Sequence, residues 1–239
     1  MGGWVCLFSG GKDSSWALYR ALEEGLPVQR LVTVIPPGDS YLYHTPLIEL
    51  TSLAAERIGI PHTIKRPENF DLYAEDEDVS ERGDRELKAL ESTLDHVENE
   101  LGFISGIVVG AIESEYQNSR FSRLCERYDA DLFAPEWQTE DHRMLLETMI
   151  DAGFKMSIVR VSAGGLDKTW LGRTLDKNAL TDLESVHNKY GIHLLGEGGE
   201  YETFVFDGPH MNNSITTELE ATYDGVRGHL EVPTTEPNS

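Results

Sequence analysis

Short apolar runs alternate with amphipathic segments along the first half of the chain. The apolar runs are bounded by turn residues and predict strands at residues 4–8, 31–35, 63–65, 104–112 and 131–134. Between them, apolar residues recur every three or four positions, which predicts helices at residues 14–24, 49–58, 85–101 and 118–127. Strands that alternate with helices form parallel sheets with right-handed crossovers. We therefore expect an α/β domain over residues 1–138.

The pattern changes after residue 138. One helix is predicted there, over residues 141–152. The apolar runs predict strands at residues 157–161, 203–206, 218–223 and 226–232. Asp224-Gly225 separates the last two runs, and this dipeptide between alternating runs predicts a β-hairpin. We expect a smaller α+β domain over residues 139–232, followed by a disordered tail over residues 233–239.

The composition is that of a folded protein outside the secretory and membrane classes. The chain has 239 residues, of which 39% are hydrophobic, enough for one large domain or two small ones. No apolar run reaches the roughly 18 residues of a membrane helix, and no basic residue precedes the first apolar run. The two cysteines, Cys6 and Cys125, are too few for a disulfide framework. We therefore expect a cytoplasmic protein that contacts no membrane.

The charge is strongly negative. The net charge is −22, from 42 acidic and 20 basic residues. An acidic surface poor in lysine is suited to concentrated salt, which suggests a halophilic source. Phosphate contacts need clustered lysine and arginine, so nucleic acid is not expected as the main partner.

A glycine-rich stretch, Ser-Gly-Gly-Lys-Asp-Ser, lies between the first predicted strand and the first predicted helix. Gly10 and Gly11 allow the backbone to approach a phosphate, while the helix N-terminus and Lys12 supply positive charge. Asp13 either caps the helix or helps to hold Mg²⁺. The spacing matches neither a Walker A loop nor Gly-x-Gly-x-x-Gly. A capped glycine turn is the alternative, but we predict a phosphate-binding loop formed by Ser9, Gly10, Gly11, Lys12, Asp13 and Ser14.

A second unusual stretch, Gly-Glu-Gly-Gly-Glu-Tyr-Glu-Thr, occupies residues 196–203. Its carboxylates are expected to crowd together, which costs energy unless a cation or proton balances them. The stretch therefore suggests a site for Mg²⁺, ammonium or a quaternary amine, with Tyr201 as a cation–π partner. An acidic surface turn is the alternative. The candidate residues are Glu197, Gly198, Gly199, Glu200, Tyr201 and Glu202.

These two stretches carry a family resemblance. The first resembles the loop of the PP-loop, or N-type ATP pyrophosphatase, superfamily. The second, with the following Phe-Val-Phe-Asp-Gly-Pro, resembles the signature of the diphthine–ammonia ligase family. Further similar segments lie at residues 40–46, 110–120, 135–137 and 164–172, so the resemblance runs from about residue 5 to residue 209, most of the chain. Three residues depart from the family pattern and leave details of the substrate pocket open: Glu115, Asn118 and Glu136.

The resemblance implies a fold and a reaction. The fold would be a parallel-sheet HUP-type domain, like the adenine nucleotide alpha hydrolases, with a smaller C-terminal α+β domain. ATP, with Mg²⁺, would adenylylate the carboxylate of diphthine on elongation factor 2, and ammonium would displace AMP to form diphthamide. Free ammonium is the expected nitrogen source, because neither cysteine has the setting of a glutamine-hydrolysing nucleophile.

The resemblance also suggests roles for single residues. Lys12 would stabilise charge on pyrophosphate, Asp13 would assist Mg²⁺, and Glu200 would act as general base toward ammonium. Tyr116 and Arg120 stand one helical turn apart and would reach AMP or substrate, unless they form a solvated helix start. His44 would contact substrate or ATP.

Other functions stay open at this point. A PP-loop ligase could adenylylate the carboxylate of a small metabolite, for example in cobalamin salvage. Action on tRNA is disfavoured, because the cysteine pairs of thiolating members are absent and the negative charge is unsuited to tRNA. A non-catalytic nucleotide-binding sensor and a structural protein are alternatives of other classes. A homodimer stays open as an assembly.

Overall fold

The computed structural model describes residues 2–35, 47–66, 79–111 and 115–233, with the backbone alone for 79–86 and 115–118. The chain divides into two compact units. The described residues of the first lie within Met1–Ser9, Asp13–His44 and Ile58–Gln138, and those of the second within Gly10–Lys12, Thr45–Arg57 and Thr139–Ser239. Each unit is thus built from separate stretches of sequence, and the expected two-domain division stays a prediction. The expected disordered tail lies, apart from Pro233, outside the described residues.

The first unit is built on a parallel sheet. Its strands follow the order β3-β2-β1-β4-β5, and every neighbouring pair is parallel. The strands are β1 (Gly3–Leu7), β2 (Val28–Val34), β3 (His62–Lys65), β4 (Ile104–Val108) and β5 (Asp131–Phe133). The prediction of an α/β parallel-sheet fold is therefore confirmed.

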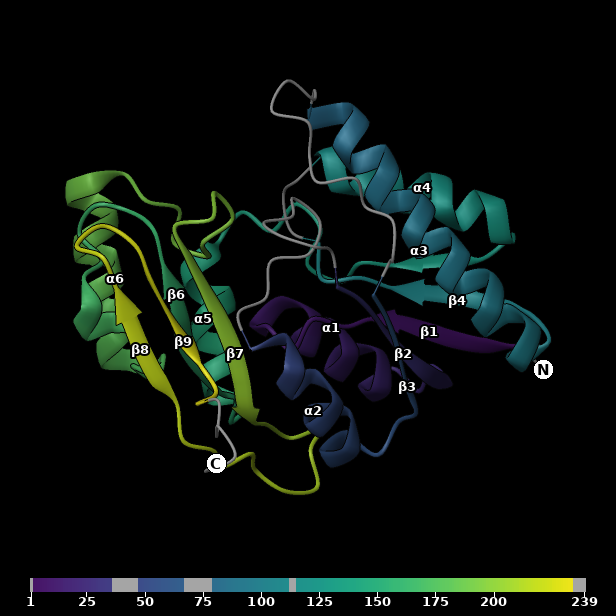
Figure 1. The fold of residues 1–239 in the computed structure, drawn as a ribbon, viewed down its shortest axis with the longest axis horizontal. Coiled ribbons are helices and arrows are strands. Elements are labelled where there is room, and N and C mark those ends of the chain that lie inside the picture. Colours follow the sequence, from purple (N-terminus) through teal and green to yellow (C-terminus); the bar gives the residue numbers. More distant parts are fainter. Residues whose placement is uncertain (1, 36–46, 67–78, 112–114, 234–239) are drawn as a thin grey trace, which may run out of the picture. The chain divides into compact units, whose positions relative to one another are not determined.

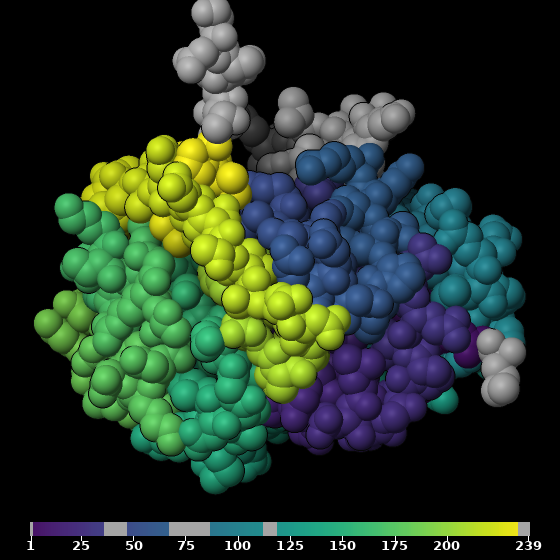
Figure 2. All heavy atoms as spheres, turned by 90° about the horizontal axis from the view of Figure 1, so that it is seen from below, coloured from purple at the N-terminus to yellow at the C-terminus, as the bar shows by residue number. Residues whose placement is uncertain are grey.

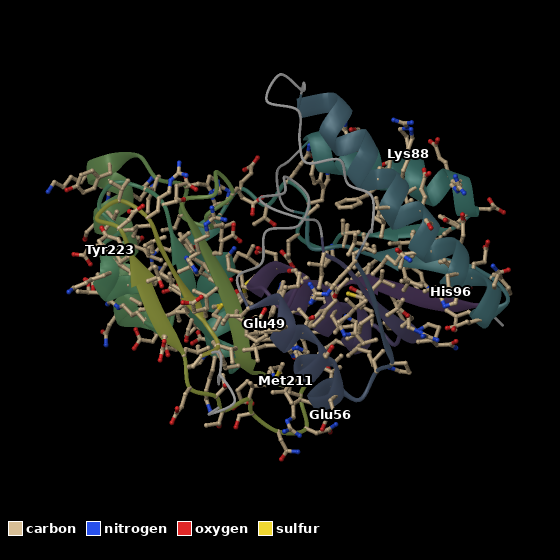
Figure 3. The ribbon with its side chains drawn as sticks, in the orientation of Figure 1. Glu49, Glu56, Lys88, His96, Met211 and Tyr223 are labelled. Carbon is tan, nitrogen blue, oxygen red and sulfur yellow. The ribbon has the colours of Figure 1, made fainter. Side chains whose placement is uncertain are left out.

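Helices cover both faces of this sheet (Figure 1). They are α1 (Lys12–Glu23), α3 (Val79–Leu101) and α4 (Glu115–Tyr128). α3 and α4 pack on one face, where alternate strand residues and one side of each helix form a core of Val5, Leu7, Val32, Leu90, Leu94, Val97, Ile107, Phe121 and Leu124. Lys88 and His96 lie on the exposed side of α3 (Figure 3). The amphipathic pattern of α3 thus has its expected cause.

The strand predicted over residues 104–112 is too long. β4 ends at Val108. Val109 and Ala111 lie beyond the strand but are still buried in the core. The apolar run therefore continues past the strand because these residues are buried. Gly110 packs against the first turn of α1, because a Cβ atom there would lie 2.4 Å from the carbonyl carbon of Asp13.

The second unit contains an antiparallel sheet of order β7-β6-β9-β8. Its strands are β6 (Lys155–Val161), β7 (Tyr201–Asp207), β8 (Glu220–Tyr223) and β9 (Gly228–Glu231). Its helical elements are η1 (Ile48–Leu50), α2 (Thr51–Ile58), α5 (His142–Asp151), η2 (Lys168–Trp170) and α6 (Lys177–Tyr190). The segment after β7 lies beside α2 (Figure 2), where the Asn212 N–H donates to the Arg57 carbonyl at 2.7 Å.

α6 was not predicted from the sequence. Its N-cap, Asp176, accepts a hydrogen bond from the Ala179 N–H at 2.7 Å, and its C-cap, Gly191, has φ of 72°. Leu180 and Leu183 form its buried side. An N-cap aspartate, leucines three residues apart and a final glycine are ordinary helix signals, so the sequence did contain this helix.

The hairpin at the end of the second unit is confirmed, with a longer turn than expected. The Asp224 carboxylate accepts from the N–H groups of Val226 and Arg227 at 2.8 and 2.7 Å. These bonds fix a turn of four residues, so the second strand begins at Gly228 and not at Val226. Among the described residues, no helix is both long and apolar enough to cross a membrane.

Candidate active site

The glycine-rich loop follows the central strand of the parallel sheet. β1 has β2 on one side and β4 on the other, so the strand order reverses there. In open parallel sheets, ligands bind outside the carboxyl ends of the strands at this switch point. The loop then leads into α1, whose N-terminus carries a partial positive charge. The loop thus lies at the edge of the sheet where ligands of such folds bind.

Internal hydrogen bonds and one glycine shape the loop. The Ser9 N–H donates to the Ser14 hydroxyl at 3.2 Å, and the two serine hydroxyls lie 3.0 Å apart. Gly10 has φ of 78°, and a Cβ atom there would lie 2.5 Å from the ring of Phe204. Glycine is therefore required at this position both by backbone conformation and by space.

The loop is attached to the free edge of β7, which is an outer strand of the antiparallel sheet. The Val205 N–H donates to the Gly10 carbonyl at 2.9 Å. The Lys12 N–H donates to the Thr203 hydroxyl at 3.1 Å. Two motifs that are about 190 residues apart in sequence are therefore joined by hydrogen bonds. Thr203 was assigned no role of its own from the sequence, although the residue ends the second motif.

The Lys12 side chain is buried, with 4% of its surface exposed. Its ammonium nitrogen lies 5.8 Å from the centre of the Tyr201 ring, within the range of a cation–π contact. The Tyr201 hydroxyl is fixed by donating to the Leu194 carbonyl at 2.6 Å. Tyr201, expected to face a substrate cation, thus has a cation of the protein beside it.

The Glu200 side chain points toward the backbone just before the second motif, where it meets His193. Its Oε1 atom accepts from the His193 N–H at 2.7 Å, while its Oε2 atom is buried and has no hydrogen-bond partner among the described residues. Gly198 leaves room for this carboxylate, because a Cβ atom there would lie 2.7 Å from Oε1. Gly199 has φ of 77°, which carries the chain back toward the strand. A buried carboxylate oxygen of this kind is suited to accept from an added donor.

The three glutamates do not converge as the sequence suggested. Glu197 is exposed, and Glu202 lies on β7 opposite Arg160 in strand register. Across the described parts of the chain, no three His, Cys, Asp or Glu side chains are placed to hold a metal ion. The reason is geometric: strand alternation separates Glu202 from Tyr201, and Glu200 turns back to His193.

The remaining candidate residues belong to the first unit. Asp13 lies in the first turn of α1, and Arg120, buried with 7% exposure, lies on α4. Tyr116 is one turn before Arg120 on α4, but its side chain, like all of His44, lies outside the described part. Glu136, which departs from the family pattern, accepts from the indole N–H of Trp16 at 2.8 Å. This buried ring and the carboxylate thus satisfy each other.

The cysteines lack the setting of a nucleophile. Cys6 and Cys125 are both buried. Burial raises the pKa of the Cys6 thiol far above its ordinary value, and burial together with the charge of Asp131 raises the pKa of Cys125 to about 11. Both thiols therefore stay protonated at neutral pH, as expected of small buried apolar groups.

Comparisons with known proteins agree with this architecture. The family models for the diphthamide synthase N-terminal domain and C-terminal domain match residues 3–130 and 141–236. A diphthine–ammonia ligase from Danio rerio is 34% identical over 227 residues, covering 91% of this chain and 87% of the relative. Those from Rattus norvegicus and Homo sapiens are 35% and 34% identical, and each comparison covers 90% of this chain and 82% of the relative. The chain therefore belongs to the diphthamide synthase family.

Proposed function

We propose that the protein is a diphthine–ammonia ligase, which uses ATP and ammonium to convert the carboxylate of diphthine on elongation factor 2 into the amide of diphthamide. The observation that carries this proposal is the attachment of the glycine-rich loop to β7, the strand that begins within the second motif (residues 196–203). The central part of the loop, Gly10–Lys12, and Glu200, whose Oε2 atom is buried, thereby belong to one compact unit. The family membership and the 91% coverage of the chain support the same conclusion.

The reaction has two steps. A carboxylate oxygen of diphthine attacks the α-phosphorus of ATP, the bond to pyrophosphate breaks, and an acyl-adenylate forms. The nitrogen of ammonia then attacks the acyl carbon, AMP leaves with the bonding electrons, and the nitrogen loses a proton. The protein must therefore hold the phosphates, stabilise charge on pyrophosphate and AMP, and remove protons from ammonium.

The loop and Lys12 provide for the first step. Ser9, Gly10, Gly11 and Ser14 offer donors and a close backbone approach to the phosphates. Lys12 would neutralise charge on the leaving pyrophosphate. Mg²⁺, when bound, would supply a Lewis acid for the phosphates. Asp13, in the first turn of α1, is proposed to assist it. One carboxylate is enough for this role, because Mg²⁺ at such sites is held mainly by the phosphates of the nucleotide and by water.

Glu200 is proposed for the second step. Its buried Oε2 atom would accept a hydrogen bond from ammonium, and the carboxylate would then take a proton as general base. The other residues of the second motif are proposed to bind substrate or ammonium: Glu197, Gly198, Gly199, Tyr201 and Glu202. Arg120, Tyr116 and His44 are proposed to contact AMP or substrate.

The setting of the protein is also a proposal. Elongation factor 2 is the protein substrate, which places the reaction in the cytoplasm, with no membrane or nucleic acid needed. The charge of −22 supports a halophilic source. A homodimer is the proposed assembly to test alongside the monomer.

The decisive experiment uses elongation factor 2 isolated from a strain that lacks this gene. The purified protein is mixed in high salt with Mg-ATP, ammonium and this factor, and mass spectrometry follows the modified histidine. Formation of the amide together with AMP would establish the ligase. An unchanged histidine, with its diphthine state confirmed, would overturn the proposed substrate and point to the carboxylate of a small metabolite.

The loop assignment has its own test in Lys12→Met, which keeps the side-chain length and removes the charge. We expect turnover to fall by about 100-fold or more, because charge on pyrophosphate is no longer balanced. Lys88→Met, at an exposed position on α3, is the matched control and should behave as wild type. Near-normal turnover of a folded Lys12→Met protein would refute the assignment.

A further inference from the structure

His193 is the centre of the hydrogen bonds in residues 193–200, which lead into and include most of the second motif and are called the glycine–glutamate loop below. Its ring Nδ1 accepts from the N–H groups of Leu195 and Glu197 at 3.2 and 3.4 Å. Its carbonyl accepts from the Gly196 N–H at 3.0 Å, and its own N–H donates to Glu200 Oε1 at 2.7 Å. One residue thereby holds both ends of the loop.

These contacts define the state of the imidazole. Nδ1 can accept from two backbone N–H groups only when it carries no proton, so the ring proton of a neutral His193 belongs on Nε2. The ring of His142 lies beside it, with centroids 4.6 Å apart and planes tilted by 50°. An aromatic contact therefore orients the ring while the backbone selects its tautomer.

We propose that His193 is a positioning residue for the ammonium step. It acts through the loop, by fixing the backbone of residues 194–200 and by orienting the Glu200 carboxylate so that Oε2 stays available. The inference rests on the proposed function, because it concerns the step in which Glu200 receives ammonium. His193 is not required to touch the reacting atoms.

The test compares two replacements that differ in one property. His193→Asn places a carbonyl oxygen where Nδ1 lies and keeps the acceptor, whereas His193→Leu fills similar space without one. We expect the KM for ammonium to rise roughly tenfold in His193→Leu, while the KM for ATP changes less than about twofold. His193→Asn should restore the KM for ammonium to within about threefold of wild type. His229→Leu, at an exposed position on β9, is the control.

Two kinetic outcomes would overturn the proposal. One is an unchanged KM for ammonium in folded His193→Leu. The other is equal impairment of His193→Asn and His193→Leu, which would show that ring packing against His142 is what matters.

A measurement on the wild-type protein depends neither on whether the variants fold nor on which substrate the enzyme uses. NMR of histidine-labelled protein at neutral pH should show Nδ1 of His193 without a proton and Nε2 with one, and the Leu195 and Glu197 amides should exchange slowly. A protonated Nδ1 or rapid exchange of both amides would overturn the inference even if the ligase activity is established. The predicted tautomer in a protein that forms no amide would instead locate the failure in the proposed function.

Discussion

Gly10 shows at the scale of one residue why the loop sequence is restrictive. Its φ of 78° is unfavourable for any residue with a side chain, and a Cβ atom would also collide with the buried ring of Phe204 at 2.5 Å. Gly25 has nearly the same φ, 75°, with nothing within 4 Å of the added atom. Substitution of Gly25 therefore causes backbone strain alone, whereas substitution of Gly10 causes both strain and a steric collision.

We therefore expect Gly10→Ala and Gly25→Ala to differ. Gly25→Ala should cost about 1 kcal/mol of unfolding free energy from strain alone and leave ATP affinity unchanged. Gly10→Ala should cost more, about 2–4 kcal/mol, and should weaken ATP binding, because the loop must move away from β7. Chemical denaturation and calorimetric titration with ATP measure the two effects. Equal behaviour of the two variants would contradict the close contact with Phe204.

At the scale of elements, β7 connects the two motifs. The Thr203 hydroxyl accepts from the Lys12 N–H, and the Val205 N–H donates to the Gly10 carbonyl. The edge of a strand offers unpaired backbone groups, and here the glycine-rich loop uses them. The strand therefore determines where the loop lies as well as how the antiparallel sheet ends.

Thr203→Val tests this connection because it keeps the shape of the side chain and removes the hydroxyl. We expect it to cost about 1–2 kcal/mol of unfolding free energy, since the Lys12 N–H loses a buried acceptor, and to raise the KM for ATP several-fold. Thr203→Ser keeps the hydroxyl and should retain nearly normal kinetics. If Thr203→Val has the ATP kinetics of wild type, the bond does not position the loop.

At the scale of the whole molecule, two partly buried histidines, His62 and His210, predict a loss of stability in acid. Burial lowers the pKa of His210 to about 4 against the opposing charge of Asp207, and burial lowers that of His62 to about 4. Both ring nitrogens of His210 lack a hydrogen-bond partner among the described residues. The unfolded chain binds these protons at its ordinary pKa near 6.5, so stability falls as the pH drops from about 6.5 toward about 4.

His210→Leu removes one of these groups. Between neutral pH and pH 5, we expect its unfolding free energy to fall by about 1–2 kcal/mol less than that of wild type. Denaturation curves at several pH values decide, and parallel curves for His210→Leu and wild type would show that His210 is not held neutral by burial.

The net charge of −22 gives a second prediction for the whole molecule. Mutual repulsion of the carboxylates opposes folding, and salt screens it because the Debye length is about 10 Å at 0.1 M and about 3 Å at 1 M. The thermal unfolding midpoint should therefore rise steeply between low and molar KCl. A midpoint that is independent of salt would show that the acidic surface does not limit stability.

The sequence by itself determined the local structure and the family. Alternating apolar runs and amphipathic segments predicted the parallel strands and their helices, because burial on one or both faces of an element leaves a period in the sequence. The loop of residues 9–14 was recognisable because its glycines, lysine and serines are consecutive. α6 was missed although its cap signals were present, and β4 was overextended because burial continues after the strand ends at Val108.

Only the tertiary structure decided how the site is assembled. That the glycine-rich loop pairs with β7, and that Lys12 lies by Tyr201, are contacts across about 190 residues, which no local pattern encodes. The same holds for the direction of Glu200: a run of glutamates and glycines suggested converging carboxylates, whereas its bond to His193 turns this one inward. Side-chain period and turn chemistry act over a few residues, but strand pairing and buried hydrogen bonds are selected by the whole fold.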